Sequence, residues 1–332
     1  MSATALAPSP FRRQAALPVL AALAFAAFGA SAMPARAQLK GLEIVAPANP
    51  GSGFDQTSRA VRDALAEAGL ASGTQVINVP GAGGLVGLAQ FVATPKRNPA
   101  MLTIGVTTVG SEITTKSAVS LDSAAPLALL LREYSVVVVP AKSDIRTMAD
   151  LTERIRRDTK TVTFAVGSTG GIDHVLAGLI VKAVGSDPKA MNAINYAGGG
   201  EQLVAVLSGR VTAGIGGAPE FASQIASGRM RALAVSSPDR LEGLDVPTLR
   251  EAGVDVTFGT WRGLMIQKDA DPETKAAMAD AIARMVATPA WKAALTQRGW
   301  IESYRPADGF AAFLAEQKAL MRTSLTDLGL VK

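Results

Sequence analysis

The stretch APANPGSGFDQTSRAVR, residues 46–62, gives the first indication of the fold of this chain. A strand-like run of small apolar residues ends at Ala48, and Pro-Gly-Ser-Gly then breaks the backbone direction. A pattern typical of a helix follows at once. The first backbone N–H groups of a helix have no intrahelical partners, and the helix dipole adds partial positive charge there. The stretch therefore predicts a strand, a glycine turn and a helix start that can hold an anion.

Three further stretches repeat this order of strand, glycine-rich turn and helix. They are NVPGAGGLVGLAQF (78–91), GSTGGIDHVLAGLI (167–180) and NYAGGGEQLVAVL (195–207). Ligands of open α/β sheets bind at the carboxyl ends of the strands. We therefore expect the four turns to converge on one cleft and to hold a carboxylate without a buried arginine. Tight helix–strand packing is the alternative explanation for each turn.

Short apolar runs alternate with amphipathic runs along the chain, which predicts an α/β fold with a mainly parallel sheet. Strands are expected at 42–48, 74–80, 101–107, 135–141, 162–168, 193–198, 211–217, 230–237 and 261–267. Helices are expected at 55–69, 83–93, 147–158, 173–184, 200–208 and 218–227, and again within 272–288 and 308–328. We expect two strands to cross between two lobes. We expect residues 38–137 plus 258–332 to form the first lobe and residues 138–257 the second.

The first 37 residues are typical of a secretory signal peptide. Arg12 and Arg13 precede an apolar run, and ARA ends at Ala37, where we expect cleavage; Ala32 is the second choice. A membrane anchor is the alternative, but the run is short. The sequence leaves the Sec and twin-arginine export routes open. The mature protein is expected to be periplasmic and without a lipid anchor, because the chain has no cysteine.

Composition excludes several classes of function. Removal of the signal segment leaves 30 Lys+Arg against 28 Asp+Glu, a net charge of +2, and no basic block points to nucleic acid. With no cysteine and the single His174, zinc motifs and thiol catalysis are absent from the sequence. Neither a nucleotide-binding motif nor a nucleophile motif is complete. We therefore expect neither enzyme activity, nor a metal, nor a cofactor.

These motifs resemble the extracytoplasmic solute-binding proteins of tripartite tricarboxylate transporters. The resemblance covers residues 38–332 and rests on PGSGFDQTSR, NVPGAGGLVGLAQF, GSTGGIDHVLAGLI, GGGEQLVAVLSGRVTAGIGGAPEF, SGRMRALAVSSPDRLEGLDVPTLREAGVDV and WRGLM. It implies a two-lobed periplasmic-binding-protein fold of type II that closes on its ligand like a flytrap. Where the tricarboxylate branch commonly has Asn-Trp-Arg, this chain has Thr260-Trp261-Arg262, so the role of position 260 is open.

The resemblance also implies the ligand, the partners and the site. It implies a monomer that captures a tri- or dicarboxylate such as citrate and delivers it to a small and a large membrane subunit. The ligand-binding residues that it implies are Gly51, Ser52, Gly53, Phe54, Asp55, Gly83, Gly84, Thr107, Ser168, Thr169, Gly170, Gly171, Asp173, His174, Gly198, Gly199, Gly200 and Glu220.

Several residues have more than one reading. Asp55 complements its helix dipole, orders the loop or accepts a ligand donor group, and Asp173 and His174 carry the same ambiguity. Glu220 and Trp261-Arg262 have a structural alternative, as surface and as core respectively. Two other functions stay open: an orphan carboxylate-binding protein that serves a sensor, and a secreted hydrolase on the same scaffold.

Overall fold

The computed structural model describes residues 38–94, 98–115, 117–167, 169–196 and 199–331. The predicted signal peptide, residues 1–37, lies outside the described residues. Gln38–Lys332 forms one compact unit. Across the part of the chain that the structure describes, no helix combines the length and the apolar character needed to cross a bilayer.

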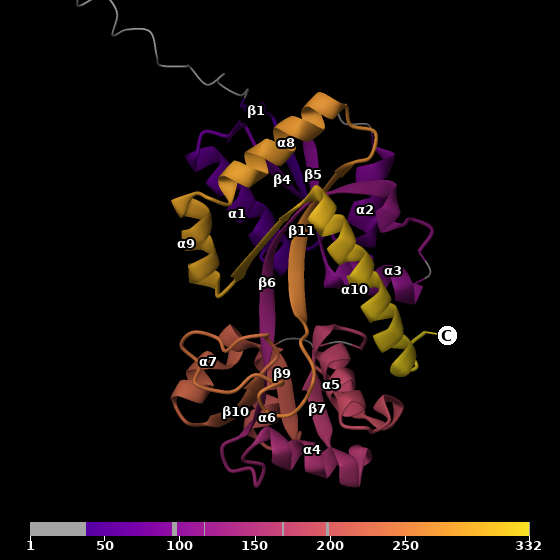
Figure 1. Ribbon diagram of the computed structural model, residues 1–332, viewed down its shortest axis with the longest axis vertical. Coiled ribbons are helices and arrows are strands. Elements are labelled where there is room, and N and C mark those ends of the chain that lie inside the picture. The colour runs from indigo at the N-terminus through magenta and orange to yellow at the C-terminus, as the bar shows by residue number, and fades with distance from the viewer. Residues whose placement is uncertain (1–37, 95–97, 116, 168, 197–198, 332) are drawn as a thin grey trace, which may run out of the picture. The chain divides into compact units, whose positions relative to one another are not determined.

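A mixed sheet runs through this unit in the order β4-β2-β5-β11-β6-β9-β7-β8, with β10 and β12 also paired to β6 (Figure 1). Its strands are β2 (Glu43–Ala46), β4 (Gln75–Asn78), β5 (Ala100–Gly105), β6 (Ala124–Pro140), β7 (Thr163–Val166), β8 (Asn192–Asn195), β9 (Ala213–Gly217), β10 (Met230–Val235), β11 (Gly259–Gln267) and β12 (Ile301–Pro306). A separate pair is β1 (Leu39–Lys40) with β3 (Ala71–Ser72).

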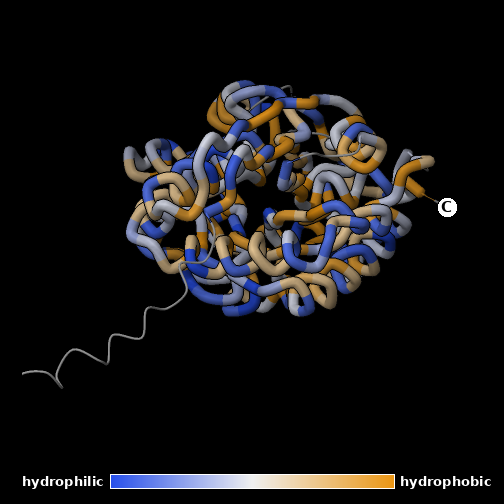
Figure 2. The backbone as a smooth tube through the Cα atoms, turned by 90° about the horizontal axis from the view of Figure 1, so that it is seen from above, coloured by the Kyte–Doolittle hydropathy of each residue, from blue (hydrophilic) through white to orange (hydrophobic). Residues whose placement is uncertain are grey.

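Helices cover both faces of the sheet. They are α1 (Gly53–Glu67), α2 (Leu85–Ala93), α3 (Val106–Thr115), α4 (Met148–Arg157), α5 (Ile172–Ala183), α6 (Gly199–Leu207), α7 (Ala218–Ala226), α8 (Pro272–Met285), α9 (Pro289–Arg298) and α10 (Ala307–Asp327). Short 3-10 turns are η1 (Ala82–Gly84), η2 (Leu121–Ser123), η3 (Thr159–Thr161) and η4 (Pro188–Ala190). Hydrophobic and hydrophilic residues interleave along the backbone of these helices (Figure 2), as expected for helices with one buried face.

The expected mainly parallel sheet is wrong for the centre of the sheet. β2 is parallel to β4 and β5, and β7 is parallel to β8 and β9. β6, however, is antiparallel to β9, β10, β11 and β12. An unbroken apolar run reports burial on both faces, but it does not report strand direction. The prediction therefore identified the buried strands and misjudged how the central ones run.

The strand β6 joins the two lobes. Its residues up to Tyr134 pair with β11, and from Ser135 onward it pairs with β9 and β10. The chain returns at Phe258, whose N–H bonds to the Ser236 carbonyl at 3.1 Å just before β11 begins. The fold is thus the two-lobed α/β fold with crossing strands that the sequence predicts. The lobe bounds given above, at 137/138 and 257/258, stay a prediction.

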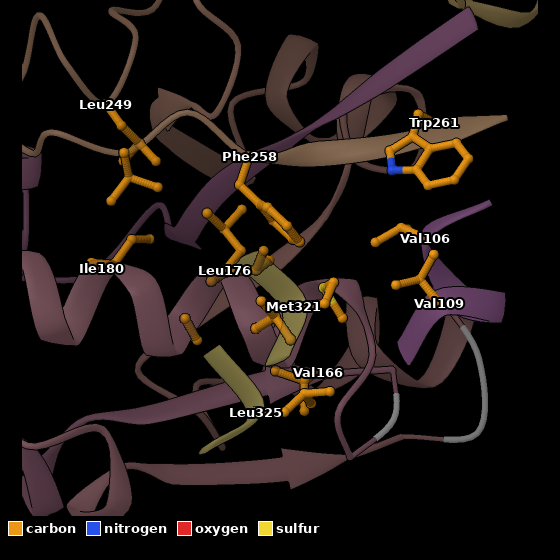
Figure 3. Close-up of a cluster of buried hydrophobic side chains, with 14 of the residues drawn as sticks. Val106, Val109, Val166, Leu176, Ile180, Leu249, Phe258, Trp261, Met321 and Leu325 are labelled. Atoms are coloured by element: carbon orange, nitrogen blue, oxygen red, sulfur yellow. The ribbon is translucent and has the colours of Figure 1, made fainter. Parts of the chain in front are cut away.

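Helix α10 also links the lobes. It packs along α3 and ends against α5, where Lys182 and Asp327 form an ion pair at 2.5 Å. Met321 and Leu325 of α10 belong to one hydrophobic cluster with Val166 and Leu176 of the second lobe and with Trp261 of β11 (Figure 3). This continuous core explains why residues 38–332 form a single compact unit.

Two elements at the C-terminal end escaped the sequence analysis. The expected helical run 272–288 ends at Met285, and α9 begins at Pro289 with Thr288 as its cap, whose hydroxyl accepts the Trp291 N–H at 3.2 Å. Proline fits the first position of a helix because its missing N–H has no partner there. β12 is exposed along much of its length and carries charges, so its sequence lacks the apolar run expected of a strand.

Candidate functional site

A cleft of about 510 Å³ opens between the two lobes. Its walls come from the turns that follow β2 and β4, from the starts of α3, α5 and α7, and from the crossing strands. The lining residues are Pro47, Ala48, Asn49, Ser52, Gly53, Phe54, Pro80, Gly81, Ala82, Gly83, Gly84, Thr107, Glu133, Tyr134, Ser135, Ile172, Asp173, Gly217, Glu220, Thr260 and Arg262. A cavity of this size holds a small organic molecule.

The start of α1 gives the cleft its first anion-binding element. Ser52 caps the helix by accepting the Asp55 N–H at 3.4 Å. Among the described residues, the N–H groups of Gly53 and Phe54 have no acceptor, and both residues border the cleft. Free N–H groups at a helix start and the positive end of the helix dipole both favour a carboxylate at this position.

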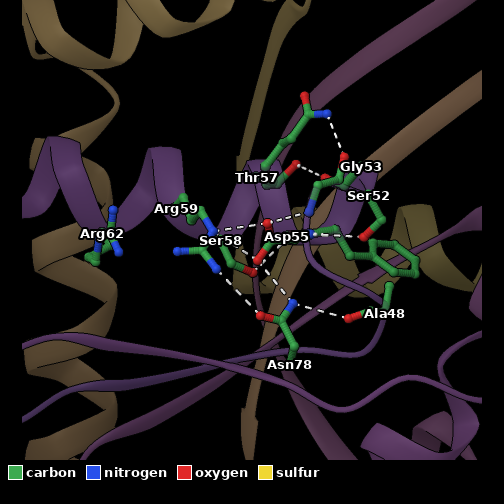
Figure 4. A network of polar contacts seen from close by, with 12 residues as sticks. Ala48, Ser52, Gly53, Asp55, Thr57, Ser58, Arg59, Arg62 and Asn78 are labelled. Carbon is green, nitrogen blue, oxygen red and sulfur yellow. Dashed lines mark hydrogen bonds and ion pairs between the residues drawn. The ribbon is translucent and has the colours of Figure 1, made fainter.

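Asp55 lies at the centre of the polar network that holds this turn together (Figure 4). Its side chain accepts the Gly51 N–H at 2.8 Å, Arg59 Nε at 2.9 Å and Asn78 Nδ2 at 2.9 Å. Asn78 also donates to the Ala48 carbonyl at 3.0 Å, which ties the ends of β2 and β4 together. Asp55 is 2 % exposed and does not border the cleft. Of its alternative roles, the geometry favours ordering the loop.

Asp55 makes the stability of the protein depend on pH. Burial alone would raise its pKa, but the bonds from Arg59, Gly51 and Asn78 outweigh burial and bring the pKa from 3.8 to about 2. A carboxylate whose pKa is lower in the folded state stabilises the fold above its unfolded pKa. That stability is lost as the pH falls from about 4 towards 2.

We therefore expect Asp55→Asn to lower the melting temperature at pH 6 and to flatten its dependence on pH between 4 and 2. Thermal unfolding of the wild type and the variant across this range tests the expectation. Asp63→Asn is the matched control, because Asp63 lies on the same helix with a side chain 65 % exposed. Equal slopes for the wild type and Asp55→Asn would contradict the assignment.

The turn after β4 forms the neighbouring wall. Gly81, Gly83 and Gly84 all have positive φ, in which side chains other than glycine are strained. A Cβ on Gly83 would also lie 2.8 Å from the Cβ of Ser111 in α3. Glycine at this position therefore lets the turn lie directly against α3, so that Gly83, Gly84 and Thr107 border the same cleft.

The second lobe contributes two carboxyl groups from helix starts. Asp173 lies in the first turn of α5 and accepts the Gly167 N–H at 3.2 Å. Burial raises its pKa to about 7, against the bond from Gly167 and with a contribution from the charge of Glu220. Glu220 lies in the first turn of α7, and burial and then the charge of Glu133 raise its pKa as well. This wall therefore carries two carboxyl groups, and burial favours the neutral form of each.

The crossing strands supply the base of the cleft. Arg262 of β11 forms an ion pair with Glu133 of β6 at 3.1 Å, and its guanidinium lies 5.5 Å from the centre of the Trp300 ring. The Arg262 side chain is 12 % exposed, and its buried Nη1 has no hydrogen-bond partner among the described residues. A buried arginine therefore borders the cleft, and the expectation that the glycine turns hold a carboxylate without one stays a prediction. The alternation of β11 puts Trp261 into the core and Arg262 at the cleft.

The structure divides the residues that were predicted to bind ligand. Those at the cleft are Ser52, Gly53, Phe54, Gly83, Gly84, Thr107, Asp173 and Glu220. Those away from its lining are Gly51, Asp55, Thr169, Gly170, Gly171, His174 and Gly200. Ser168 and Gly198 lie outside the described residues, and Gly199 is described only as the first residue of α6. His174 accepts the Gly170 N–H through Nδ1 at 2.9 Å, and burial lowers its pKa, which fits a role in ordering the turn before α5.

Three of the four glycine-rich turns contribute residues to the cleft. The described residues of the fourth turn, in the stretch 195–207, do not line the cleft. The junction of β9 and α7 lines it instead, through Gly217 and Glu220. The sequence analysis missed Glu133 and assigned Arg262 no role in the site. A signal for both exists, since each is a charge inside an apolar strand, in LLLREYSVVVV and in GTWRGLM. A buried charge in a sheet needs a partner, and here each is the partner of the other.

The described part of the chain has no preformed metal site. Within those residues, no three His, Cys, Asp or Glu side chains gather closely enough to hold a metal ion. The carboxyl groups of the cleft belong to different elements, and one of them is already paired with Arg262. The arrangement suits the binding of a small charged molecule.

Comparison with known proteins assigns the chain to a family. The family model described as tripartite tricarboxylate transporter family receptor matches residues 57–330. A ligand-free solute-binding protein of this type from Polaromonas superposes with a TM-score of 0.75 at 24 % identity and covers 87 % of this chain and 99 % of its own.

Two solved structures from Rhodopseudomonas palustris carry ligands. One is MatC with bound malate, at a TM-score of 0.66 and 19 % identity, covering 86 % of this chain and 99 % of its own. The other is Rpa4515 with adipate, at a TM-score of 0.71 and 18 % identity, covering 87 % and 97 %. At these identities the two likenesses show a shared fold.

Proposed function

Because the chain belongs to the receptor family of the tripartite tricarboxylate transporters, we propose that it captures a small carboxylate in the cleft between its lobes. The observation that carries the proposal is the start of α1, where the free N–H groups of Gly53 and Phe54 border the same cleft as the guanidinium of Arg262, which lies against Gly53. Backbone N–H donors together with the guanidinium of Arg262, which Glu133 holds in place, complement the charge of a carboxylate.

Binding of the carboxylate is coupled to closure of the lobes. A ligand seated at the start of α1 makes further contacts with the second lobe only when the lobes approach each other, so it favours the closed form. The crossing strands are the hinge, and the end of α10 on α5 moves with the second lobe or slides against it. The ligand leaves chemically unchanged, so the protein acts as a receptor and not as an enzyme.

Delivery follows from the family. Proteins of this family are periplasmic receptors of tripartite transporters. We place the mature protein in the periplasm as a monomer, with the small and the large membrane subunit of such a transporter as its partners. The closed, loaded form is the one that these subunits recognise. Citrate, other di- and tricarboxylates and aromatic acids are the ligands to weigh, and the charges of the cleft decide among them.

Thermal unfolding in the presence of single carboxylates tests the proposal. We expect at least one acid to raise the melting temperature, because a ligand that binds only the folded protein stabilises it by about 2.7 kcal/mol at 100 times its Kd. The panel includes malate and adipate, which the structural neighbours bind, together with citrate and amino-substituted acids. The matched controls are the neutral diamides of malate and adipate. If no acid in the panel outperforms its neutral amide, the proposal fails.

A further inference from the structure

The charges that border the cleft do not balance. Among the residues that line it, Arg262 is the cation, and Glu133, Asp173 and Glu220 are the acids. The Arg262–Glu133 ion pair at 3.1 Å accounts for one charge of each sign. Two carboxyl groups of the second lobe are left without a cation, at a site that receives an anion on its other side.

Neither remaining acid finds a cation elsewhere. In the described ranges, the contacts of Asp173 and Glu220 are with backbone N–H groups, those of Gly167 and Gly217 respectively, and neither side chain takes part in an ion pair. Burial raises the pKa values of both acids most, and the charge of a neighbouring carboxylate adds to it, that of Glu133 at Glu220 and that of Glu220 at Asp173. Three carboxyl groups therefore lie close enough to influence one another, and only that of Glu133 is paired with a cation among the described residues.

Glu133 and Glu220 converge beside Gly217. The position that a Cβ of Gly217 would occupy lies 3.5 Å from Glu133 Oε1 and 3.6 Å from the Cδ of Glu220. Gly217 itself borders the cleft, and without a side chain it leaves that space open. On the opposite wall, the start of α1 reaches the guanidinium of Arg262. The cleft therefore has an anion-binding end on the first lobe and an acidic end on the second.

This polarity discriminates between classes of carboxylate. The second carboxylate of a diacid would lie against Asp173 and Glu220, and such like-charge juxtaposition is unfavourable. A ligand with a positive group at its far end would pair with both acids and so lower the free-energy cost of burying their charges. We propose, resting on the proposed function, that the cleft selects a zwitterion whose carboxylate binds at the start of α1 and whose remote ammonium or guanidinium group binds between Glu220 and Asp173.

Matched sets of ligands test the proposal by calorimetry at pH 8. The sets contain four, five and six carbons. In each set the acids are the unsubstituted monoacid, the α,ω-diacid and the ω-amino acid, as in hexanoate, adipate and 6-aminohexanoate; 2-aminohexanoate places the same charge next to the carboxylate. We expect the best ω-amino acid to bind at least tenfold more tightly than the diacid and the monoacid of its length, and more tightly than its α-amino isomer.

Removal of one acid should reverse the preference. In Glu220→Gln we expect the affinity for the ω-amino acid to fall about tenfold and that for the diacid to rise. Asp173→Asn should act in the same direction. Glu242→Gln is the control, because Glu242 lies exposed on the same lobe and away from the cleft, and it should leave the ratio unchanged. The melting temperature of each variant checks that it is folded.

The failures can be told apart. A diacid that binds more tightly than the ω-amino acid at every length overturns the zwitterion and leaves the carboxylate receptor standing. An α-amino isomer that binds best overturns the remote position of the positive charge. A ratio that Glu220→Gln does not change also overturns the proposal. If no member of any set binds and the wider panel fails as well, the proposed function itself falls.

Discussion

Gly53→Ala is expected to weaken carboxylate binding about 100-fold. A Cβ at this position would overlap the guanidinium of Arg262 and approach its Cζ to 2.9 Å. The guanidinium is held by Glu133 at 3.1 Å and by the Trp300 ring, so it can move away only by giving up those contacts. Loss of one charged partner in a buried pair costs about 2–5 kcal/mol, and 2.7 kcal/mol corresponds to about 100-fold.

The control is Gly200→Ala, which adds the same methyl group near the start of α6. A Cβ there has no atom within 4 Å, and Gly200 does not border the cleft. Its affinity should equal that of the wild type. Combining Gly53→Ala with Arg262→Met tests whether the methyl group acts by displacing the Arg262 guanidinium, since coupled residues give non-additive effects. The double variant should lose less binding free energy than the sum of the losses in the two single variants. Full additivity, or equal losses in the two glycine variants, would rule out this explanation.

Trp261→Ala is expected to lower the free energy of unfolding by about 3–5 kcal/mol, as large-to-small changes at buried aromatic residues do. The side chain is 1 % exposed and makes edge-to-face contacts with Phe310 and Phe313, with ring centres 5.8 Å and 5.3 Å away respectively. Its Nε1 donates to Gln317 at 3.1 Å. The change would open a cavity where β11 meets α10, within the cluster that joins the lobes.

Urea denaturation followed by fluorescence and circular dichroism measures this loss. Trp261→Phe keeps an aromatic ring and should lose clearly less stability than Trp261→Ala. Val204→Ala serves as the control, because Val204 is 55 % exposed and such surface changes lie within about 0.5 kcal/mol of the wild type. A loss of less than about 1 kcal/mol for Trp261→Ala would show that the core repacks around the missing ring.

Much of the fold could be predicted because its local signals agree. The apolar run before Gly167 became β7, and the helical pattern from Asp173 became α5, each within a few residues. The first part of β6, residues 124–134, could not be predicted in this way, since a leucine-rich run fits a helix as well as a strand. What makes it a strand is pairing with β11 and β12, which come more than a hundred residues later in the chain.

The candidate site was predictable to a different degree on its different walls. The turns after β2 and β4 carry their function in their glycines, so Gly53, Gly83 and Gly84 could be found from local sequence. Arg262 and Glu133 lie 129 residues apart and become a pair only when β6 and β11 align. Asp55 shows the opposite limit, because its position predicted a helix start correctly, while its bond to Asn78, 23 residues away, depends on the fold.

The sequence by itself determined that this chain alternates strands and helices, and that glycine turns leave helix starts able to hold an anion. Those properties depend on neighbours within a few residues, through hydrogen bonding and backbone freedom. Only the tertiary structure decided which helix starts share a cleft and that Arg262 borders it. It also decided that two acids of the second lobe have no cation beside them. Charge balance in a cleft is a sum over residues from distant parts of the chain, and only folding brings those residues together.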